Sequence, residues 1–580
     1  MKPAPTPHAL LDAPAVAKLL MEIGQRLSLA GENPYKARSY SRAAQGLMSL
    51  TVSLEEVIAS DRLREIPGVG AALAEAIKHL HQHGTTSKLE AMRAELPAGL
   101  LALSRIPGLP PNKVVQLHRK LGISSIEELE RACRDERLAS VKGLGAALQK
   151  KVLDGLDLMR RSQAQRLIHH AEDVLTATVA NISHSHPELR RVVPAGEFRR
   201  GCELVADMAV VAETPQGGDT RVIDLNGVIQ LWLAEAKRYG PALIFATGSA
   251  EHVRQLQGLA EEKGFRLEKG GLYRGKRLLP CKAEEAVFGA LDLPFIPPEL
   301  REGAGELELA RTGRLPKLVS GKDIRGLLHC HTDFSDGGNT LEEMAEATRD
   351  RGFQYFGVAD HSQSAGYARG LKLEDLEAQH AEADALNARY GGRFRVFKGI
   401  ESDILQDGSL DYPDEVLDRF DFVVASVHSR FRLDKKAQTE RILRAVGKPY
   451  TTILGHMTGR MLMRRPGYDV DVERILRACA KHGVAVEINA NPHRLDVDWR
   501  WHRRALELGC MMSINPDAHS MEELDLTRWG VLMARKGGVP PDRVLNCLAL
   551  AELDEFLARR KALRPSTAIS LRRRARRAAT

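Results

Sequence analysis

Two histidines one residue apart stand in the apolar segment at residues 324–332. If this segment is a β-strand, side chains at positions i and i+2 point to the same side, so His329 and His331 can bind one metal ion. One such pair is a weak signal, because His184 and His186 form a second pair in a stretch without a buried-strand pattern, which is predicted to be a loop. The first pair predicts a metal site only if its context is repeated.

Six more apolar runs downstream of this pair each end in a side chain that can bind a metal ion. The residues at these ends are Asp360 with His361, Glu401, His428, His456, Asn489, and Asp517 with His519. If the runs are parallel strands, their carboxyl ends meet on one face, so these side chains are expected to lie close together.

Amphipathic segments separate these runs, and four of them are followed directly by a glycine. These glycines are Gly352, Gly447, Gly483 and Gly509. Glycine just past the end of a helix is the usual left-handed cap. Strand and helix units with reactive side chains at the strand ends predict a (β/α) barrel with its active site on that face.

The bulk properties of the chain indicate a multidomain protein, because 580 residues exceed the size of one hydrophobic core. The seven cysteines include no Cys-x-x-Cys pair, which argues against a disulfide framework or a zinc ribbon and favours a reducing cytoplasm. No secretory signal pattern opens the chain, and no apolar run approaches the roughly 18 residues of a membrane span, so no membrane partner is expected. The net charge of +8 is compatible with a polyanionic partner.

A glycine-containing turn recurs three times in the first 160 residues, which otherwise have a helical pattern. The glycines of the three copies are Gly68 with Gly70, Gly108, and Gly143 with Gly145. In a helix-hairpin-helix, such glycines bring backbone N–H groups to a phosphate at a helix N-terminus without reading the base sequence. The repeat therefore predicts binding to a nucleic-acid backbone. The second copy has Pro110 and Pro111 where another glycine is usual, so it is expected to hold phosphate least well.

The helical start, the glycine turns and the barrel together resemble the bacterial family X DNA polymerases that carry a C-terminal PHP phosphoesterase domain. The resemblance covers nearly the whole chain and implies a helix-hairpin-helix N-terminal region, an α+β polymerase-like palm and a distorted (β/α)7 PHP barrel. The expected domains are a helical DNA-binding domain at 1–85, a fingers-like helical domain at 86–162, a palm and thumb at 163–290, a linker at 291–320, the barrel at 321–562 and a basic tail at 563–580.

The palm departs from the pattern of the family, which has Gly-Ser, two arginines, an Asp-x-Asp pair and a third aspartate on a neighbouring strand. Here Gly196 is followed by Glu197, and the pair is Asp207 with Ala209. Counting back from the Thr-Gly-Ser turn of the family places Gln230 where the third aspartate would stand. Two-metal phosphoryl transfer needs carboxylates to hold both ions, so we expect the palm to be degenerate, without polymerase activity, and to position DNA.

The resemblance to the PHP domain implies a set of metal ligands, and this chain has a suitable residue at every position of that set. These nine residues are His329, His331, Asp336, His361, Glu401, His428, His456, Asp517 and His519. By analogy, one ion would be held by His329, His331, Glu401 and Asp517, a second by Glu401, His428 and His456, and a third by Asp336, His361 and His519. Such ligands suit Mn²⁺, Zn²⁺ or Fe²⁺, so two or three divalent ions are expected as cofactors. A hydroxide on these ions would be the nucleophile, with no separate catalytic residue.

These observations predict a metal-dependent DNA phosphoesterase that removes nucleotides from 3′ ends during repair, located in the cytoplasm at the nucleoid. DNA ends and gaps are the expected partners, together with other repair proteins. Arg460, Arg494 and Lys398 are candidates for orienting the phosphate, with a surface or structural role equally open. Three alternatives remain: an active family X polymerase with an associated nuclease, a small-molecule phosphatase of the histidinol-phosphate type, and a non-catalytic scaffold for DNA ends.

Overall fold

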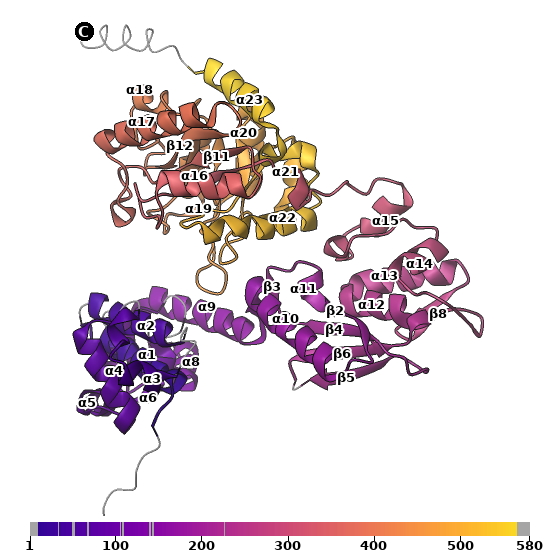
Figure 1. Ribbon diagram of the computed structural model, residues 1–580, viewed down its shortest axis with the longest axis horizontal. Coiled ribbons are helices and arrows are strands. Elements are labelled where there is room, and N and C mark those ends of the chain that lie inside the picture. The colour runs from indigo at the N-terminus through magenta and orange to yellow at the C-terminus, as the bar shows by residue number, and fades with distance from the viewer. Residues whose placement is uncertain are drawn as a thin grey trace, which may run out of the picture. The chain divides into compact units, whose positions relative to one another are not determined.

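The chain divides into two compact units, residues 1–164 and 165–580 (Figure 1). The computed structural model describes residues 10–32, 34–48, 53–66, 69–104, 106, 109–138, 141, 144–225 and 227–564. Within these residues, no helix combines the length and the apolar character that a membrane crossing would need. The basic tail expected from residue 563 lies almost wholly outside them.

The first unit is helical and contains two hydrophobic cores. Its helices are α1 (Ala13–Leu29), α2 (Pro34–Met48), α3 (Leu54–Ala59), η1 (Leu63–Glu65), α4 (Ala71–His83), α5 (Ser87–Glu95), α6 (Ala98–Ser104), α7 (Pro111–Leu121), α8 (Ile126–Arg134) and α9 (Gly145–Ala164). One core is formed by residues between Val16 and Met92, and the other mainly by residues between Leu96 and Leu156.

The three glycine turns share one backbone pattern. In each, an apolar residue accepts a hydrogen bond from the N–H three residues later, and a helix begins within two residues. The bonds join Val69 to Ile66 at 3.0 Å, Leu109 to Ile106 at 3.1 Å and Leu144 to Val141 at 2.9 Å. Gly70 precedes α4, and Gly145 opens α9 with a φ of 57°. The other predicted glycines, Gly68, Gly108 and Gly143, lie outside the described residues.

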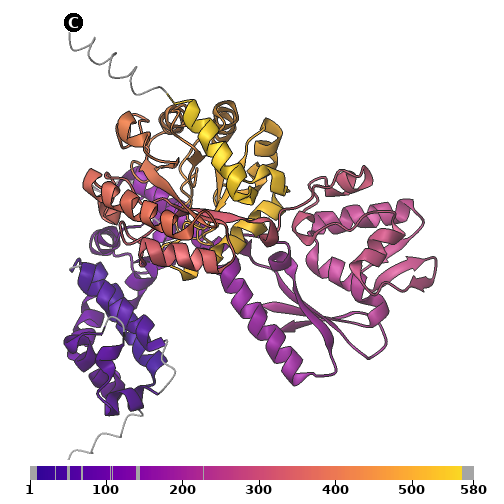
Figure 2. The ribbon, with the colours of Figure 1, turned by 45° about the horizontal axis from the view of Figure 1, so that its top comes forward.

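The second unit begins with a palm built on a four-stranded sheet in the order β2-β4-β6-β5. Its strands are β2 (Arg190–Ala195), β4 (Met208–Glu213), β5 (Arg221–Leu225) and β6 (Ile229–Ala234), of which β4 and β6 are parallel. Helix α10 (Ile168–Ser185) packs against β2 and β4 (Figure 2). His184 lies in the last turn of this helix and His186 caps it, so the expected loop at this second histidine pair is wrong.

A thumb follows the palm and shares its core with the predicted linker. Its elements are α12 (Tyr239–Thr247), α13 (Ala250–Glu262), β7 (Arg266–Glu268), β8 (Gly271–Arg274), β9 (Arg277–Leu279) and α14 (Glu284–Ala290). The expected linker at 291–320 contains η3 (Pro298–Leu300) and α15 (Glu306–Arg311). Ile296 and Leu307 join the thumb core, so these residues are packed rather than a free spacer.

The rest of the second unit is a barrel of parallel strands in sequence order, β10-β11-β12-β13-β14-β15-β16. They are β10 (Gly326–Cys330), β11 (Tyr355–Val358), β12 (Arg395–Asp403), β13 (Phe422–Ser426), β14 (Ile453–Leu454), β15 (Ala485–Asn489) and β16 (Met512–Asn515). A parallel bridge between Cys330 and Ala518 brings the first and last strands together. All seven strands are buried on both faces, as expected for a barrel enclosed by helices.

The helices around the barrel are α16 (Leu341–Asp350), α17 (Leu373–Tyr390), α19 (Lys435–Val446), α20 (Val472–His482), α21 (His502–Leu508), α22 (Thr527–Lys536) and α23 (Leu550–Ala562) (Figure 1). Gly352, Gly483 and Gly509 follow their helices in the left-handed conformation. Gly447 does not: its φ is −72°. The expected cap is wrong there because the chain continues in turns, with the N–H of Lys448 bonded to the carbonyl of Ala445.

A buried lysine joins the barrel to the palm and thumb. The Lys536 side chain on α22 is fully buried; its ammonium donates to the backbone carbonyl of Arg200 at 3.1 Å, pairs with Glu302 and lies 4.5 Å from the Trp499 ring. Nearby, Glu203 accepts hydrogen bonds from Trp499 Nε1 and Arg500 at 3.0 and 2.9 Å. These bonds hold the palm loop after α11 (Gly196–Arg199) on the barrel.

Replacing Lys536 by alanine is expected to lower the free energy of unfolding by about 2 kcal/mol, because it leaves a cavity and removes one of the two cations paired with Glu302, which keeps Arg200. Urea unfolding of the full chain, followed by tryptophan fluorescence, measures this. The control is Arg254→Ala, which removes an exposed pair with Glu251 and should cost under about 0.5 kcal/mol. Equal stabilities of the two variants would contradict the prediction.

Candidate metal centre

The first two predicted ligands lie at the end of β10, where the strand is irregular. Its pairing with β11 shifts register between Leu327 and Cys330, and His329 has a φ of 56°. A positive φ is uncommon for a residue other than glycine and is often found at functional sites. His329 and His331 still converge: their Nε2 atoms lie 3.6 and 3.2 Å from Asp517 Oδ1. The alternation of a regular strand is therefore not what brings these two histidines together.

The carboxylate of Glu401 lies at the middle of the centre. It is 1% exposed and stands near the end of β12. Imidazole nitrogens of five histidines surround it: His329 at 3.2 Å, His331 at 3.7 Å, His361 at 3.0 Å, His428 at 3.3 Å and His456 at 2.9 Å. These histidines come from the ends of four strands, β10, β11, β13 and β14, or from the loops that follow them.

A second cluster lies beside the first and is open to solvent. Asp336 Oδ1 lies 3.4 Å from His519 Nε2, 3.7 Å from His361 Nε2 and 4.0 Å from His331 Nδ1. The rings of His331 and His519 are stacked 4.2 Å apart. Asp336 and His519 each have a third of their side chain exposed, so this side is the entrance to the centre.

All nine predicted ligands thus come together, and their grouping differs in part from the analogy. Four sets have ligand atoms within 4.8 Å of one another: His331, Asp336, His361 and His519; His329, His331 and Glu401; His329, His456 and Asp517; and His361, Glu401 and His428. Four residues, His329, His331, His361 and Glu401, each take part in two sets. Neighbouring sets therefore share side chains.

The buried ring nitrogens fit a group of divalent ions. His329 Nε2, both ring nitrogens of His331, His361 Nδ1 and His456 Nδ1 are buried without a hydrogen-bond partner among the described residues. Burying such polar atoms without partners is costly, and metal ions would coordinate their lone pairs. Burial, with the rings of His519 and His361 nearby, lowers the pKa of His331 to about 3, so this imidazole is neutral at pH 7 and able to bind a metal.

Glu487 is a functional residue that the sequence reasoning missed. It lies within β15, is fully buried, and accepts hydrogen bonds from His329 Nδ1 at 2.5 Å, the His456 backbone N–H at 2.6 Å and Asn515 at 2.9 Å. A carboxylate bonded to the second nitrogen of a histidine fixes which nitrogen faces the metal. The signal was a single acidic residue inside an otherwise apolar strand.

Three other polar residues support the ligands. Asp403 accepts from His428 Nδ1 at 2.6 Å, and Asp360 accepts from Thr332 and Ser335 and so holds the loop after His331. Asn489, expected from its place at a strand end to be able to bind a metal, donates to Asp517 at 3.0 Å. This hydrogen bond orients the carboxylate of Asp517.

Of the three cations considered for orienting a phosphate, only Arg494 borders the centre. Its Nε lies 3.6 Å from Asp517 Oδ2. Lys398 pairs with Asp384 at 2.9 Å, and Arg460 pairs with Asp498 at 2.7 Å. Of these three cations, Arg494 is therefore the one close enough to contact an anion bound at the centre.

Two of the predicted palm residues lie on neighbouring strands. Ala209 on β4 pairs with Gln230 on β6 in parallel register. The Glu197 carboxylate accepts the backbone N–H groups of Ala206 and Asp207 at 2.6 and 3.1 Å. Burial and the neighbouring Glu197 raise the pKa of Asp207. Within the described residues, the clusters able to hold a metal all belong to the barrel.

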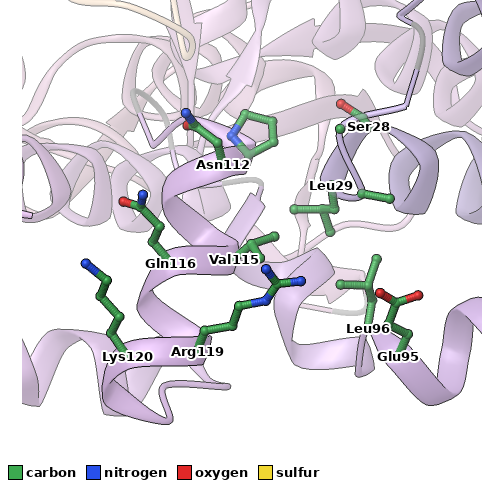
Figure 3. Close-up of a pocket in the computed structure, with 12 residues that line it drawn as sticks. Ser28, Leu29, Glu95, Leu96, Asn112, Val115, Gln116, Arg119 and Lys120 are labelled. Atoms are coloured by element: carbon green, nitrogen blue, oxygen red, sulfur yellow. The ribbon is translucent and has the colours of Figure 1, made fainter. Parts of the chain in front are cut away.

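The helical unit contains a cavity of about 660 Å³ between the end of α1, the end of α5 and α7. Asn112, Gln116, Arg119 and Lys120 reach it from α7, the helix that follows the second glycine turn (Figure 3). It has no group of metal-binding side chains within the described part of the chain.

Comparison with family models matches residues 12–86 to a helix-hairpin-helix domain and 100–157 to a SAM-like helix-hairpin-helix tandem. Residues 242–302 match the DNA polymerase beta thumb, and residues 328–491 match the PHP domain. The fold and the site thus define a PHP barrel joined to a polymerase thumb and helix-hairpin-helix domains. The predicted fold class is confirmed.

The chain is 32% identical over 570 residues to the DNA polymerase/3′-5′ exonuclease PolX of Bacillus subtilis, covering 94% of this chain and 99% of that protein. It belongs to the PolX family, which confirms the resemblance drawn from the sequence. A probable phosphatase of Thermoanaerobacter sp. is 25% identical over 245 residues, and one of Vibrio parahaemolyticus is 26% identical over 244. Each of these two matches covers 40% of this chain.

Adding Mn²⁺ or Zn²⁺ to chelator-treated protein is expected to raise the melting temperature, because only the folded centre binds the ions. At 100 times the dissociation constant, the gain is about 2.7 kcal/mol. A His329→Ala/His331→Ala variant should lose most of this gain, whereas His184→Ala/His186→Ala, which changes the exposed histidine pair, should keep it. An equal rise in melting temperature in both variants would show that the ions bind at another site.

Glu487→Gln is expected to weaken metal binding about 10- to 100-fold, since the amide no longer accepts strongly from His329. Competition with a chromogenic chelator measures the affinity. Glu377→Gln, at a largely exposed position on α17, is the matched control and should change nothing. An unchanged affinity in Glu487→Gln would show that this carboxylate does not tune the centre.

Proposed function

We propose that this protein is a metal-dependent phosphoesterase that shortens DNA from its 3′ end during repair, and that its palm no longer polymerises. The observation that carries the proposal is the buried Glu401 carboxylate, which lies within 4.0 Å of five histidines at the mouth of the barrel. Family membership and the three hairpin turns support DNA as the substrate. The nine ligand residues are proposed as the active site.

The residues of the chain have separate tasks in this reaction. Divalent ions, when bound, supply Lewis-acid chemistry that activates water near neutral pH and neutralises phosphoryl oxygens. Glu487 and Asp403 hold His329 and His428 with their Nε2 atoms turned toward Glu401. Arg494, beside Asp517, positions the phosphate. The exposed side of Asp336 and His519 admits the DNA end.

The proposed loss of polymerase activity rests on the side chains of the palm. Ala209 and Gln230 face each other on neighbouring strands and offer no carboxylate. Asp224 lies opposite Gln230 on β5, where it accepts the backbone N–H of Gly227 at 2.9 Å. Glu197 adds a negative charge beside Asp207, where an incoming triphosphate would be repelled. We infer that the palm positions DNA for the barrel.

A second candidate function is that of a small-molecule phosphatase. The probable phosphatases match only 40% of this chain, so such an activity would need the barrel alone. The PolX relative instead matches 94% of the chain, which favours a DNA substrate. Action at DNA gaps, at the nucleoid and beside other repair proteins belongs to the same proposal.

The experiment that tests the proposal uses a 5′-labelled primer on a gapped template in Mn²⁺, with and without nucleotides. We expect the wild-type chain to shorten the primer and not to extend it. His329→Ala/His331→Ala should lower the rate at least about 100-fold, because it removes ligands of the centre, and His184→Ala/His186→Ala should match the wild type.

Two outcomes would contradict the proposal. Primer extension would show that the palm polymerises. Rapid hydrolysis of p-nitrophenyl phosphate without any shortening of DNA would favour the small-molecule phosphatase.

A further inference from the structure

An exposed tyrosine stands directly over the metal centre. Tyr367 lies on η5 (Gly366–Ala368), in the loop that follows the ligand His361. Its side chain is 68% exposed, although its ring centroid lies only 5.8 Å from that of His361 and 6.2 Å from that of His428. The ring meets both imidazoles at steep angles, 63° and 67°.

The loop that carries this ring is firmly anchored. Ala365 and Leu371 are fully buried, and the N–H of Leu371 donates to the carbonyl of His361 at 2.9 Å, which closes the loop at its base. The N–H of Ser364 donates to Asp411 at 2.7 Å, which fixes its first half. The backbone therefore presents Tyr367 to solvent in one position.

The place of this ring suggests the chemistry of its ligand. His361, Glu401 and His428 form one of the clusters able to hold a metal ion. The Tyr367 ring lies beside two of these three residues, so a phosphate bound at this cluster would have its nucleoside within reach of the exposed aromatic face. Aromatic side chains bind nucleobases by stacking, without regard to base identity.

We propose that Tyr367 is a specificity-determining platform on which the base next to the scissile phosphate stacks. This inference rests on the proposed function and adds how the centre selects a nucleic acid. A phosphomonoester without a base gains nothing from the ring. Tyr367 thus separates DNA from the small phosphate esters that the same centre could hydrolyse.

The test removes the ring from the protein and the base from the DNA. The substrates are a 5′-labelled single-stranded oligonucleotide with a natural 3′ end, and two copies that carry a tetrahydrofuran abasic residue at the last or the penultimate position. On the natural end, Tyr367→Ala should raise KM about 5- to 100-fold, the usual worth of one stacked base. Tyr367→Phe should restore the wild-type KM to within about threefold. The control is Leu373→Ala, at a 49% exposed apolar residue at the start of α17, which should behave as wild type.

If the inference is right, the rise in KM caused by Tyr367→Ala shrinks to less than about twofold on one of the two abasic substrates. The position of the missing base in that substrate identifies the base that stacks. An equal rise in KM on all three substrates overturns the inference, because the ring would then act on the centre and not on a base. Shortening of no oligonucleotide by the wild-type chain overturns the proposed function itself. Metal content that differs between Tyr367→Ala and wild type would likewise contradict a role in base stacking alone.

Discussion

The architecture of the barrel depends on one buried carboxylate, Glu401, placed among five histidine rings. A charge buried this deeply is costly unless opposite charges or hydrogen bonds surround it. Strand β12 runs to Asp403, past Glu401, so one strand supplies both the central carboxylate and the partner that orients His428. Side chains from four other strand ends converge on Glu401, so this site requires those strand ends to lie at matching heights.

Buried acidic groups form a second layer around the ligands. Glu487 bonds His329 and the backbone of His456, so it ties the first strand to the fifth through the centre of the barrel. Asp360 bonds Thr332 and Ser335 and so fixes the loop that carries Asp336. The interior is therefore polar at the carboxyl ends of the strands, whereas Leu328, Phe397 and Phe422 make it apolar further down. Hydrophobic packing supports the strands, and hydrogen bonds position the ligands.

Much of the barrel and of its candidate site was predictable from the sequence, since parallel strands bring their carboxyl ends to one face of a barrel. The pattern of metal-binding side chains after apolar runs therefore predicted the barrel, and it predicted that the ligands lie close together. The pattern could not predict the left-handed conformation of His329, because a bulge depends on the register with β11. The role of Glu487 could not be predicted, because its bonds to His329 and to the His456 backbone depend on how β10 and β14 lie around β15. The right-handed Gly447 was missed because later hydrogen bonds, not the glycine alone, set its conformation.

The two arginines of the palm are paired with acidic side chains of the thumb and of the segment that follows it. Arg199 is bonded to both oxygens of Glu284 at 2.8 and 2.7 Å, and Arg200 donates to Glu302 at 3.0 Å and to the carbonyl of Thr247 at 2.7 Å. Their charges are thus neutralised within the chain. Glu302 also pairs with Lys536 of the barrel. Arg200 and Glu302 therefore help to fasten the palm to the barrel through Lys536, and a palm held in this way fits the proposal that it positions DNA for the barrel.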